Sequence, residues 1–293
     1  MNNSLQDTVD LNISISGIFS NSHFKNVFEK GESSYIDTKI KKYSNTLGIE
    51  SSKTRKTILN SFYSYLLESY RCEYVYKNLI TKKILLGRHS LNTSTLINEF
   101  RIGSSLADSV LINGSSILYE IKTELDSPNR LFDQLSDYKK AFPCIYIVVH
   151  HSEEKKYLDI VENTSVGLLA LNKRFQLSEV KKAKRDVSHL DITTMFKSLR
   201  KKEYSNIIAE VYGSVPEIPN MFYFKECLKL AQKMDAVKFH EMMNKELKKR
   251  KPTGIETLTS NKLPGYLTNI CLSIDPSKKD YDRLFTYLNK KIV

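Results

Sequence analysis

The first clear pattern in the chain is a run of apolar residues at three- and four-residue steps between residues 56 and 79. This spacing places the apolar side chains on one face of a helix. It predicts a single helix over 56–79, whose inward stripe is formed by Leu59, Phe62, Leu66, Tyr70 and Tyr74. The first fifty residues, rich in Ser, Asn and Lys, predict only small helices and loops.

Short strand-like runs follow at 96–102, 106–112, 117–124 and 144–150. Asn113 and Gly114 separate the second run from the third, which is a strong hairpin signal. Between the third and fourth runs, apolar residues at helical spacing follow Pro128, which suits the start of a helix. Because a helical crossover joins parallel strands, we expect the last strand to be parallel to a neighbour in a mixed sheet.

Beyond the apolar run 166–171 the pattern becomes helical and basic, with amphipathic helices predicted over 195–211, 222–247 and 281–291. The pattern therefore predicts an α/β core flanked by helical additions. We expect three parts: a mostly helical region at 1–65, the core at 66–175 and a basic helical region at 176–293.

The net charge of +12 is concentrated in the last part of the chain. Residues 176–293 carry 23 basic and 14 acidic side chains, which accounts for nine of the excess positive charges. A basic region beside a near-neutral core suits a polyanionic partner, because Lys and Arg release counterions from phosphates. A Lys-rich solvated surface is an equally good interpretation of the composition alone.

Several classes of protein are disfavoured. The longest apolar runs are too short to span a bilayer, and the first residues lack the pattern of a secretory signal. The four cysteines contain no CxxC pair, which disfavours a zinc site. His150 and His151 are adjacent on a strand and so point to opposite faces, which disfavours a shared metal. We expect a cytoplasmic protein without membrane contact.

One acidic pair stands out within apolar strands. The triplet Glu-x-Lys occurs five times, but only the one at Glu120 lies in an apolar strand and follows an aspartate, Asp108, by twelve residues. A carboxylate within a strand that otherwise belongs to the core requires a metal or a charged partner.

Strand geometry relates the two acids. Glu120 and Lys122 are two residues apart and share one face of the sheet. A two-residue turn would place Asp108 on the opposite face from Glu120, whereas a longer turn that pairs Ile112 with Ser116 would place Asp108 across from Glu120. We therefore expect a bulged or longer turn.

With that register, two carboxylates and an ammonium converge. Like charges this close repel unless a divalent cation lies between them. Oxygen ligands with open water positions suit Mg²⁺, and Mn²⁺ would substitute. Such a metal polarises a phosphate and activates water, while Lys122 would orient that water and offset the developing charge.

The stretch from Asn98 to Val149 resembles the PD-(D/E)XK nuclease superfamily, in a poorly characterised bacterial branch, and the similarity covers about residues 70–175. The resemblance implies a restriction-endonuclease-like core: a helix, a three-strand antiparallel meander, a helix and a parallel strand. It also implies that Asp108 and Glu120 bind the metal, that the carbonyl of Ile121 is a further ligand, and that Lys122 assists the water.

The resemblance extends to accessory residues. Gln134 and Tyr138 match the glutamine and tyrosine of RecB-like members and, one helical turn apart, share a face. Tyr138 could instead be a core residue and Gln134 a surface residue. A further metal-binding glutamate would be Glu73 on the first helix or Glu99 on the first strand, and either could be a structural ion-pair acid. Ala107 replaces the proline of the founding motif.

The leading hypothesis is a Mg²⁺-dependent DNA endonuclease that acts in phage defence or in a mobile element. The alternatives are a catalytically silent nucleic-acid-binding protein and a partner-activated subunit of a defence complex. Superfamily members often dimerise, so a homodimer is a further expectation. The sequence does not distinguish DNA from RNA, single from double strands, or endonuclease from exonuclease action.

Overall fold

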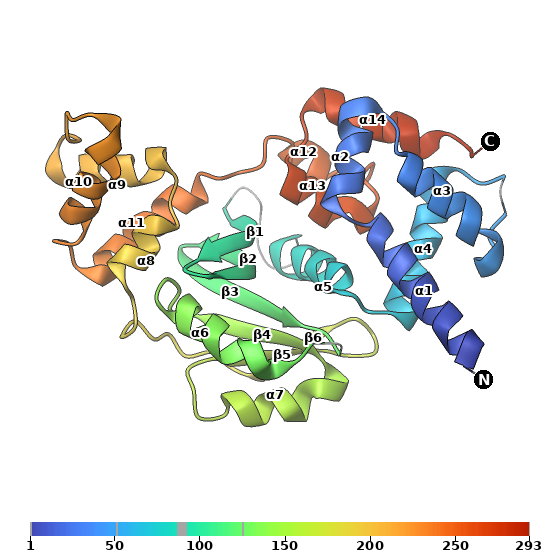
Figure 1. Ribbon diagram of the computed structural model, residues 1–293, viewed down its shortest axis with the longest axis horizontal. Helices are drawn as coiled ribbons and strands as arrows, with labels where there is room; N and C mark the ends of the chain where they lie inside the picture. Colours follow the sequence, from blue (N-terminus) through green and yellow to red (C-terminus); the bar gives the residue numbers. More distant parts are fainter. Residues whose placement is uncertain (1, 51, 87–92, 125, 293) are drawn as a thin grey trace. The chain divides into compact units, whose positions relative to one another are not determined.

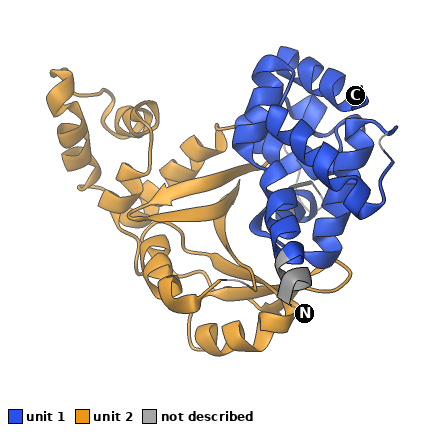
Figure 2. Ribbon diagram, turned by 45° about the vertical axis from the view of Figure 1, so that its right-hand side comes forward, with its two compact units in different colours: residues 1–86, 252–293 blue, residues 87–251 orange. Residues whose placement is uncertain are grey.

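The computed structural model describes residues 2–50, 52–86, 93–124 and 126–292 (Figure 1). The chain divides into two compact units, which we call unit 1 (residues 1–86 and 252–293) and unit 2 (residues 87–251) (Figure 2). None of the helices described is long and apolar enough to cross a membrane.

Unit 1 is helical and combines segments from both ends of the chain. Helix α14 packs against α2 and α4, and α13 packs against α2 and α5. Asp37 accepts hydrogen bonds from the guanidinium of Arg55 and from the hydroxyl of Tyr287, which ties three helices together. The α-helices are α1 (Asn2–Ile18), α2 (Asn21–Lys30), α3 (Ser34–Tyr43), α4 (Arg55–Ser69), α5 (Glu73–Ile80), α12 (Ile255–Leu258), α13 (Thr268–Ile274) and α14 (Lys278–Asn289). Shorter turns are the 3₁₀ segments Asn45–Leu47 and Gly265–Leu267 and the π-helical segment Thr81–Leu86.

Unit 2 is built on a six-stranded sheet whose strands lie side by side in sequence order. The first three strands are antiparallel, β3, β4 and β5 are parallel, and β6 is antiparallel to β5. This confirms the α/β class, the mixed sheet and the parallel fourth strand. The strands are β1 (Thr95–Ile102), β2 (Ser105–Asn113), β3 (Ser115–Lys122), β4 (Ile145–His150), β5 (Gly167–Leu171) and β6 (Leu177–Lys181).

Helices from two parts of unit 2 share one hydrophobic core with the sheet. Helix α6 packs on β2, α7 packs on β5, and α11 packs on β2 and β3. Buried side chains of all these elements form one cluster. The helices are α6 (Leu131–Lys139), α7 (Glu154–Val161), α8 (Ile192–Lys197), α9 (Lys201–Tyr212), α10 (Asn220–Ala231) and α11 (Ala236–Lys248), with 3₁₀ turns at Pro128–Arg130 and His151–Glu153.

The long helices predicted from periodicity are interrupted. The predicted helix 56–79 is two helices, because Tyr70 leaves the helical region with φ −151° and ψ 87°. The segment 222–247 also contains a break, where the Asp235 side chain accepts a hydrogen bond from the Lys238 amide and starts α11. Side-chain caps of this kind start a new helix without disturbing the spacing of apolar residues, so periodicity does not reveal them. The segment 195–211 is likewise divided between α8 and α9.

The observed units also differ from the expected division into 1–65, 66–175 and 176–293. The basic C-terminal segment is split, because its helices up to residue 251 pack with the sheet and those beyond it pack with the N-terminal helices. The helix 56–79, assigned to the core from about residue 66, belongs entirely to unit 1.

Candidate functional site

The β2–β3 hairpin fixes the faces on which the candidate acids lie. Ile112 pairs with Ser116 and Asn113 with Ser115, which confirms the register expected for a longer turn. Gly114 stands between the strands with φ +71°, a conformation that glycine adopts without steric cost. The even register places the positions of Asp108 and Glu120 opposite each other on one face of the sheet.

The Asp108 carboxylate lies against the neighbouring strand. The regular pairing of β2 and β3 reaches Ser109 and Tyr119. Beyond this pair, the Ile121 amide donates a hydrogen bond of 2.8 Å to Oδ2 of Asp108. The side chain of Asp108 thus contacts the backbone of β3 between Glu120 and Lys122.

Glu120 and Lys122 form a buried ion pair. Their side chains are 3% and 9% exposed, and Nζ of Lys122 lies 2.9 Å from Oε1 of Glu120. Burial raises the pKa of the Glu120 carboxyl and outweighs the lowering effect of the neighbouring ammonium. The lysine also donates a hydrogen bond of 2.8 Å to Oε1 of Gln134 on α6, so its position is held from two sides.

Tyr138 completes this network from one turn further along α6. Its ring is fully buried in the core, and its hydroxyl lies 2.8 Å from Oε2 of Glu120 and 3.0 Å from the carbonyl oxygen of Leu106. The amide of Gln134 approaches the same hydroxyl at 3.5 Å. Burial and the charge of Glu120 raise the pKa of Tyr138, so the phenol stays protonated and can donate. Tyr138 is therefore a core residue with a polar group at the candidate site.

The two candidates for a further acid lie in different surroundings. Glu99 is exposed on β1, in the register position opposite Asp108, and its φ of 54° is unusual for a residue other than glycine. Glu73 belongs to unit 1, where its carboxylate lies 2.5 Å from the ammonium of Lys77. In the described ranges no group of three or more His, Cys, Asp or Glu side chains could hold a metal.

The carboxylates that share this face of the sheet, and that a divalent cation could use, are those of Asp108 and Glu120. Oε1 of Glu120 accepts from Lys122 and Oε2 accepts from Tyr138, and each oxygen of a carboxylate can accept more than one bond. A donor set of few carboxylates with water in the remaining positions is the type that Mg²⁺ accepts.

A residue that the sequence did not single out, Asp137, fixes the β1–β2 turn to α6. It accepts hydrogen bonds from the Ser104 amide at 3.1 Å and from the hydroxyls of Ser104 and Ser105 at 2.8 and 2.9 Å. Burial raises the pKa of Asp137, but these hydrogen bonds outweigh it and the net shift is downward. Gly103, with φ +58°, brings the turn so close that an added Cβ would lie 2.8 Å from the carboxylate.

A second polar group that the sequence did not reveal joins α11 to the hairpin. Nε2 of His240 lies 2.9 Å from the Ser116 hydroxyl, and the Asn244 amide lies 3.3 Å from the same ring nitrogen. Burial, assisted by the charge of Arg185, lowers the pKa of His240 to about 4. The ring is therefore neutral at ordinary pH. Its only sequence signal is the spacing of four residues between His240 and Asn244 on one helix face.

The basic residues after α11 have structural partners. Arg250 donates hydrogen bonds of 2.6 and 2.7 Å to the Glu203 carboxylate, and Lys249 pairs with Glu246. The contact of Arg250 with Glu203 holds the end of α11 against α9, whereas the Lys249 pair lies within the end of α11 itself.

The chain matches one known family over a segment that includes residues of both units. The family described as "Bacteriophage P4 protein cII" matches residues 67–262, which is more than half of the chain and includes the whole candidate site. The chain belongs to this family.

Other comparisons add little. No curated protein matches the chain. A solved structure, titled "SPO1766 protein of unknown function from Silicibacter pomeroyi", is similar at 12% sequence identity, over 41% of this chain and 81% of that one, with a TM-score of 0.28. That score is too low to define a shared fold.

Proposed function

We propose that this protein is a Mg²⁺-dependent nuclease of the PD-(D/E)XK type that hydrolyses phosphodiester bonds, with DNA as its substrate. The observation that carries the proposal is the alignment of Asp108 with Glu120 on neighbouring antiparallel strands, beside Lys122 on the same face. Placing a half-buried carboxylate beside a buried carboxylate and a buried amine costs stability, and such arrangements are concentrated at functional sites. Mn²⁺ would substitute for Mg²⁺ at oxygen ligands.

In this proposal each side chain has a separate task. A bound divalent cation supplies Lewis acidity and lowers the pKa of a water molecule. Asp108 and Glu120 provide its carboxylate ligands, with the Ile121 carbonyl as a further candidate. The ammonium of Lys122 offsets negative charge that develops on the phosphate. Gln134 keeps Lys122 in place, and Tyr138 fixes the orientation of Glu120.

The partner and the biological setting are part of the same proposal. The net charge of +12 favours association with a polyanion. The family is described by a protein of bacteriophage P4, which supports a role in a mobile element more than one in defence against phage.

The test is cleavage of supercoiled plasmid with Mg²⁺ and with EDTA. We expect nicked or linear DNA with Mg²⁺ alone, and a loss of at least about 100-fold in rate for Asp108→Asn and Lys122→Ala, as for removal of other charge-stabilising groups. Matched controls are Asp159→Asn and Lys155→Ala, which change exposed residues of α7. Cleavage that survives both site substitutions would remove this centre from the mechanism.

A second candidate function is nucleic-acid binding without cleavage. The observation that favours it is the ion pair itself, because Lys122 already neutralises Glu120 and the described residues offer no cluster of three acids. Wild-type protein that binds DNA but cuts none with Mg²⁺ or Mn²⁺ would favour this function. Cleavage that appears only after a second protein is added would favour a partner-activated subunit.

A further inference from the structure

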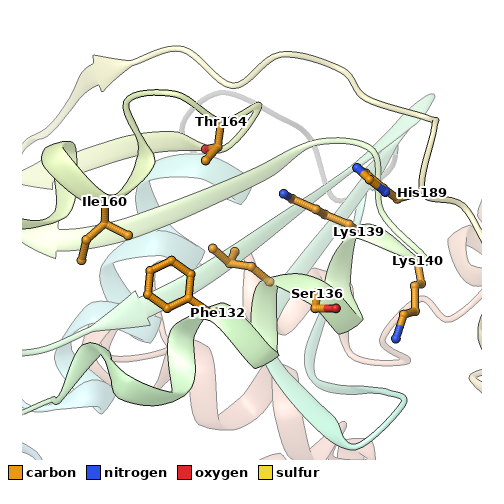
Figure 3. Close-up of a pocket in the computed structure, with 8 residues that line it drawn as sticks. Phe132, Ser136, Lys139, Lys140, Ile160, Thr164 and His189 are labelled. Atoms are coloured by element: carbon orange, nitrogen blue, oxygen red, sulfur yellow. The ribbon is translucent and has the colours of Figure 1, made fainter.

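A cavity of about 330 Å³ lies on the side of α6 that carries none of the candidate catalytic residues. Its walls come from α6, from α7 with the turn that follows it, and from the segment 182–191 (Figure 3). This volume is at the lower end of the range for small-ligand sites and suits one nucleotide rather than a large molecule. The lining residues are Phe132, Leu135, Ser136, Lys139, Lys140, Ile160, Thr164 and His189.

One part of the cavity is apolar and carries an exposed aromatic ring. Phe132 is 63% exposed, although it lies next to the fully buried Leu131. Leu135 and Ile160 complete this part, and Figure 3 shows Ile160 beside the Phe132 ring. An exposed ring beside alkyl groups offers a flat apolar surface on which a nucleobase can stack.

The rest of the cavity is basic. Lys139 and His189 both line the cavity, and Figure 3 shows both away from Ile160. Within the described part of the chain the ammonium of Lys139 has no ion-pair partner, whereas Lys140 pairs with Asp137 at 3.2 Å. The nearest acid to His189 is Asp186, at 3.8 Å and already bound by serine hydroxyls. This part of the cavity therefore suits an anion.

Further positive charge lies on the segment 182–191, which contributes His189 to the cavity. The Lys184 amide donates to the carbonyl of Ser165, and the Asp191 amide donates to the carbonyl of Lys140, so the segment 182–191 is fixed against the cavity walls. Three of its basic side chains are exposed: Lys182, Lys184 and Arg185. This charge adds to the attraction of a polyanion to the segment that carries His189.

We propose that the cavity binds one nucleotide of a single nucleic-acid strand, with the base on Phe132 and its phosphate between Lys139 and His189. An aromatic platform combined with a basic track is the arrangement that holds single strands without sequence preference. The inference goes beyond the proposed nuclease function, because none of the residues that line the cavity belongs to the candidate catalytic set. Binding here requires neither a metal nor cleavage.

The experiment measures binding of fluorescein-labelled dT12 by anisotropy in EDTA, with full-length protein. Phe132→Ala should weaken binding about five- to 150-fold, the range of single base–aromatic stacks, and Phe132→Trp should keep it. Lys139→Gln should reduce the slope of log affinity against log salt by about 0.7. Phe222→Ala and Lys225→Gln, which change exposed residues of α10, are matched controls and should have little effect.

Two results would overturn the inference. One is a Phe132→Ala protein that binds dT12 as tightly as the Phe222→Ala control. The other is a Phe132→Ala substitution that weakens binding to a blunt duplex of the same length as much as it weakens binding to dT12. A duplex offers no unstacked base, so the stack on Phe132 should not contribute to its binding. Because no metal is present, these results are independent of the nuclease assay: Asp108→Asn tests cleavage and leaves the cavity intact, and Phe132→Ala tests the cavity alone.

Discussion

The hydroxyl of Tyr138 separates the structural and chemical contributions of a single residue. Tyr138→Phe keeps the buried ring but removes the hydroxyl, whose one proton can be donated to Glu120 or shared with the Leu106 carbonyl. Leaving buried acceptors without a donor costs about 1–3 kcal/mol, so we expect that loss in the free energy of unfolding, measured with urea. The plasmid cleavage rate should fall as well, because Glu120 loses its orientation.

The matched control for this substitution is Tyr157→Phe. Tyr157 is also fully buried, but its hydroxyl has no hydrogen-bond partner within the described structure. Removing that hydroxyl should leave stability unchanged or raise it. Equal effects of the two substitutions would show that the Tyr138 hydrogen bonds contribute nothing.

We expect the stability of the folded protein to depend on pH through His240. Because its pKa falls from 6.5 to about 4 on folding, the unfolded chain binds a proton that the folded protein does not between these values. The stability contribution of the neutral ring is complete above about pH 6.5 and is lost as pH falls towards 4. The stability difference between wild type and His240→Gln should shrink by about 3 kcal/mol over that interval. A difference that stays constant with pH, measured by urea unfolding, would contradict this explanation.

Single residues were predictable where the local pattern made them anomalous. Asp108, Glu120 and Lys122 are charged residues within apolar strands, so the sequence pattern singles them out. The assumed strand register then places them on one face of the sheet. Asp137 and His240 carry no such anomaly, because a polar residue on a helix is ordinary until the strand against it is known. Their partners come from other elements, which local patterns do not identify.

At the scale of elements, the contact between the β1–β2 turn and α6 holds β2 against the helix that carries Gln134 and Tyr138. Gly103→Ala should disturb this contact in two ways. An alanine is strained at a φ of +58°, and its methyl group would clash with Asp137. We expect a cost of about 1–3 kcal/mol in unfolding free energy and a reduced cleavage rate.

Gly114→Ala provides the comparison. Its φ is also positive, at +71°, but among the described residues none other than its chain neighbours comes within 4 Å of the added methyl group. Gly114→Ala should therefore lower the unfolding free energy only through backbone strain, and by less than Gly103→Ala does. If both substitutions cost the same, the close approach of Asp137 to the turn has no energetic importance.

Strands were more predictable than helices. The register of β2 and β3 followed from a requirement that both acids share a face, and the structure has that register. The helix breaks after Ser69 and before Asp235 escaped prediction, because apolar spacing continues across a short interruption. The positive φ of Glu99 escaped as well, since a glutamate gives no sign of this backbone conformation.

At the scale of the whole molecule, unit 1 depends on the last forty or so residues of the sequence. Helices α13 and α14 pack against α2, α4 and α5. A chain that stops after Lys251 should therefore lose the packing of unit 1, while unit 2 keeps all of its own elements. Hydrogen exchange should show lost amide protection over 55–80 and retained protection in β3 and β4. Protection of 55–80 that survives the truncation would contradict this dependence.

This organisation was not predictable from periodicity. The pairing of the two chain ends, through Asp37, Arg55 and Tyr287, joins residues about 250 positions apart. A pattern read within a short window contains no information about such a partner. The basic composition of 176–293 suggested a single lobe, but composition does not show which helices share a core.

The sequential order of the six strands has a consequence for how the chain acquires its structure on the ribosome. Each strand of unit 2 pairs with the one synthesised immediately before it, so the sheet can grow as the nascent chain emerges. The helices α2, α4 and α5 emerge earlier, but they cannot complete their packing until α13 and α14 have been translated. Unit 1 can therefore be completed only after the sheet of unit 2 has been synthesised.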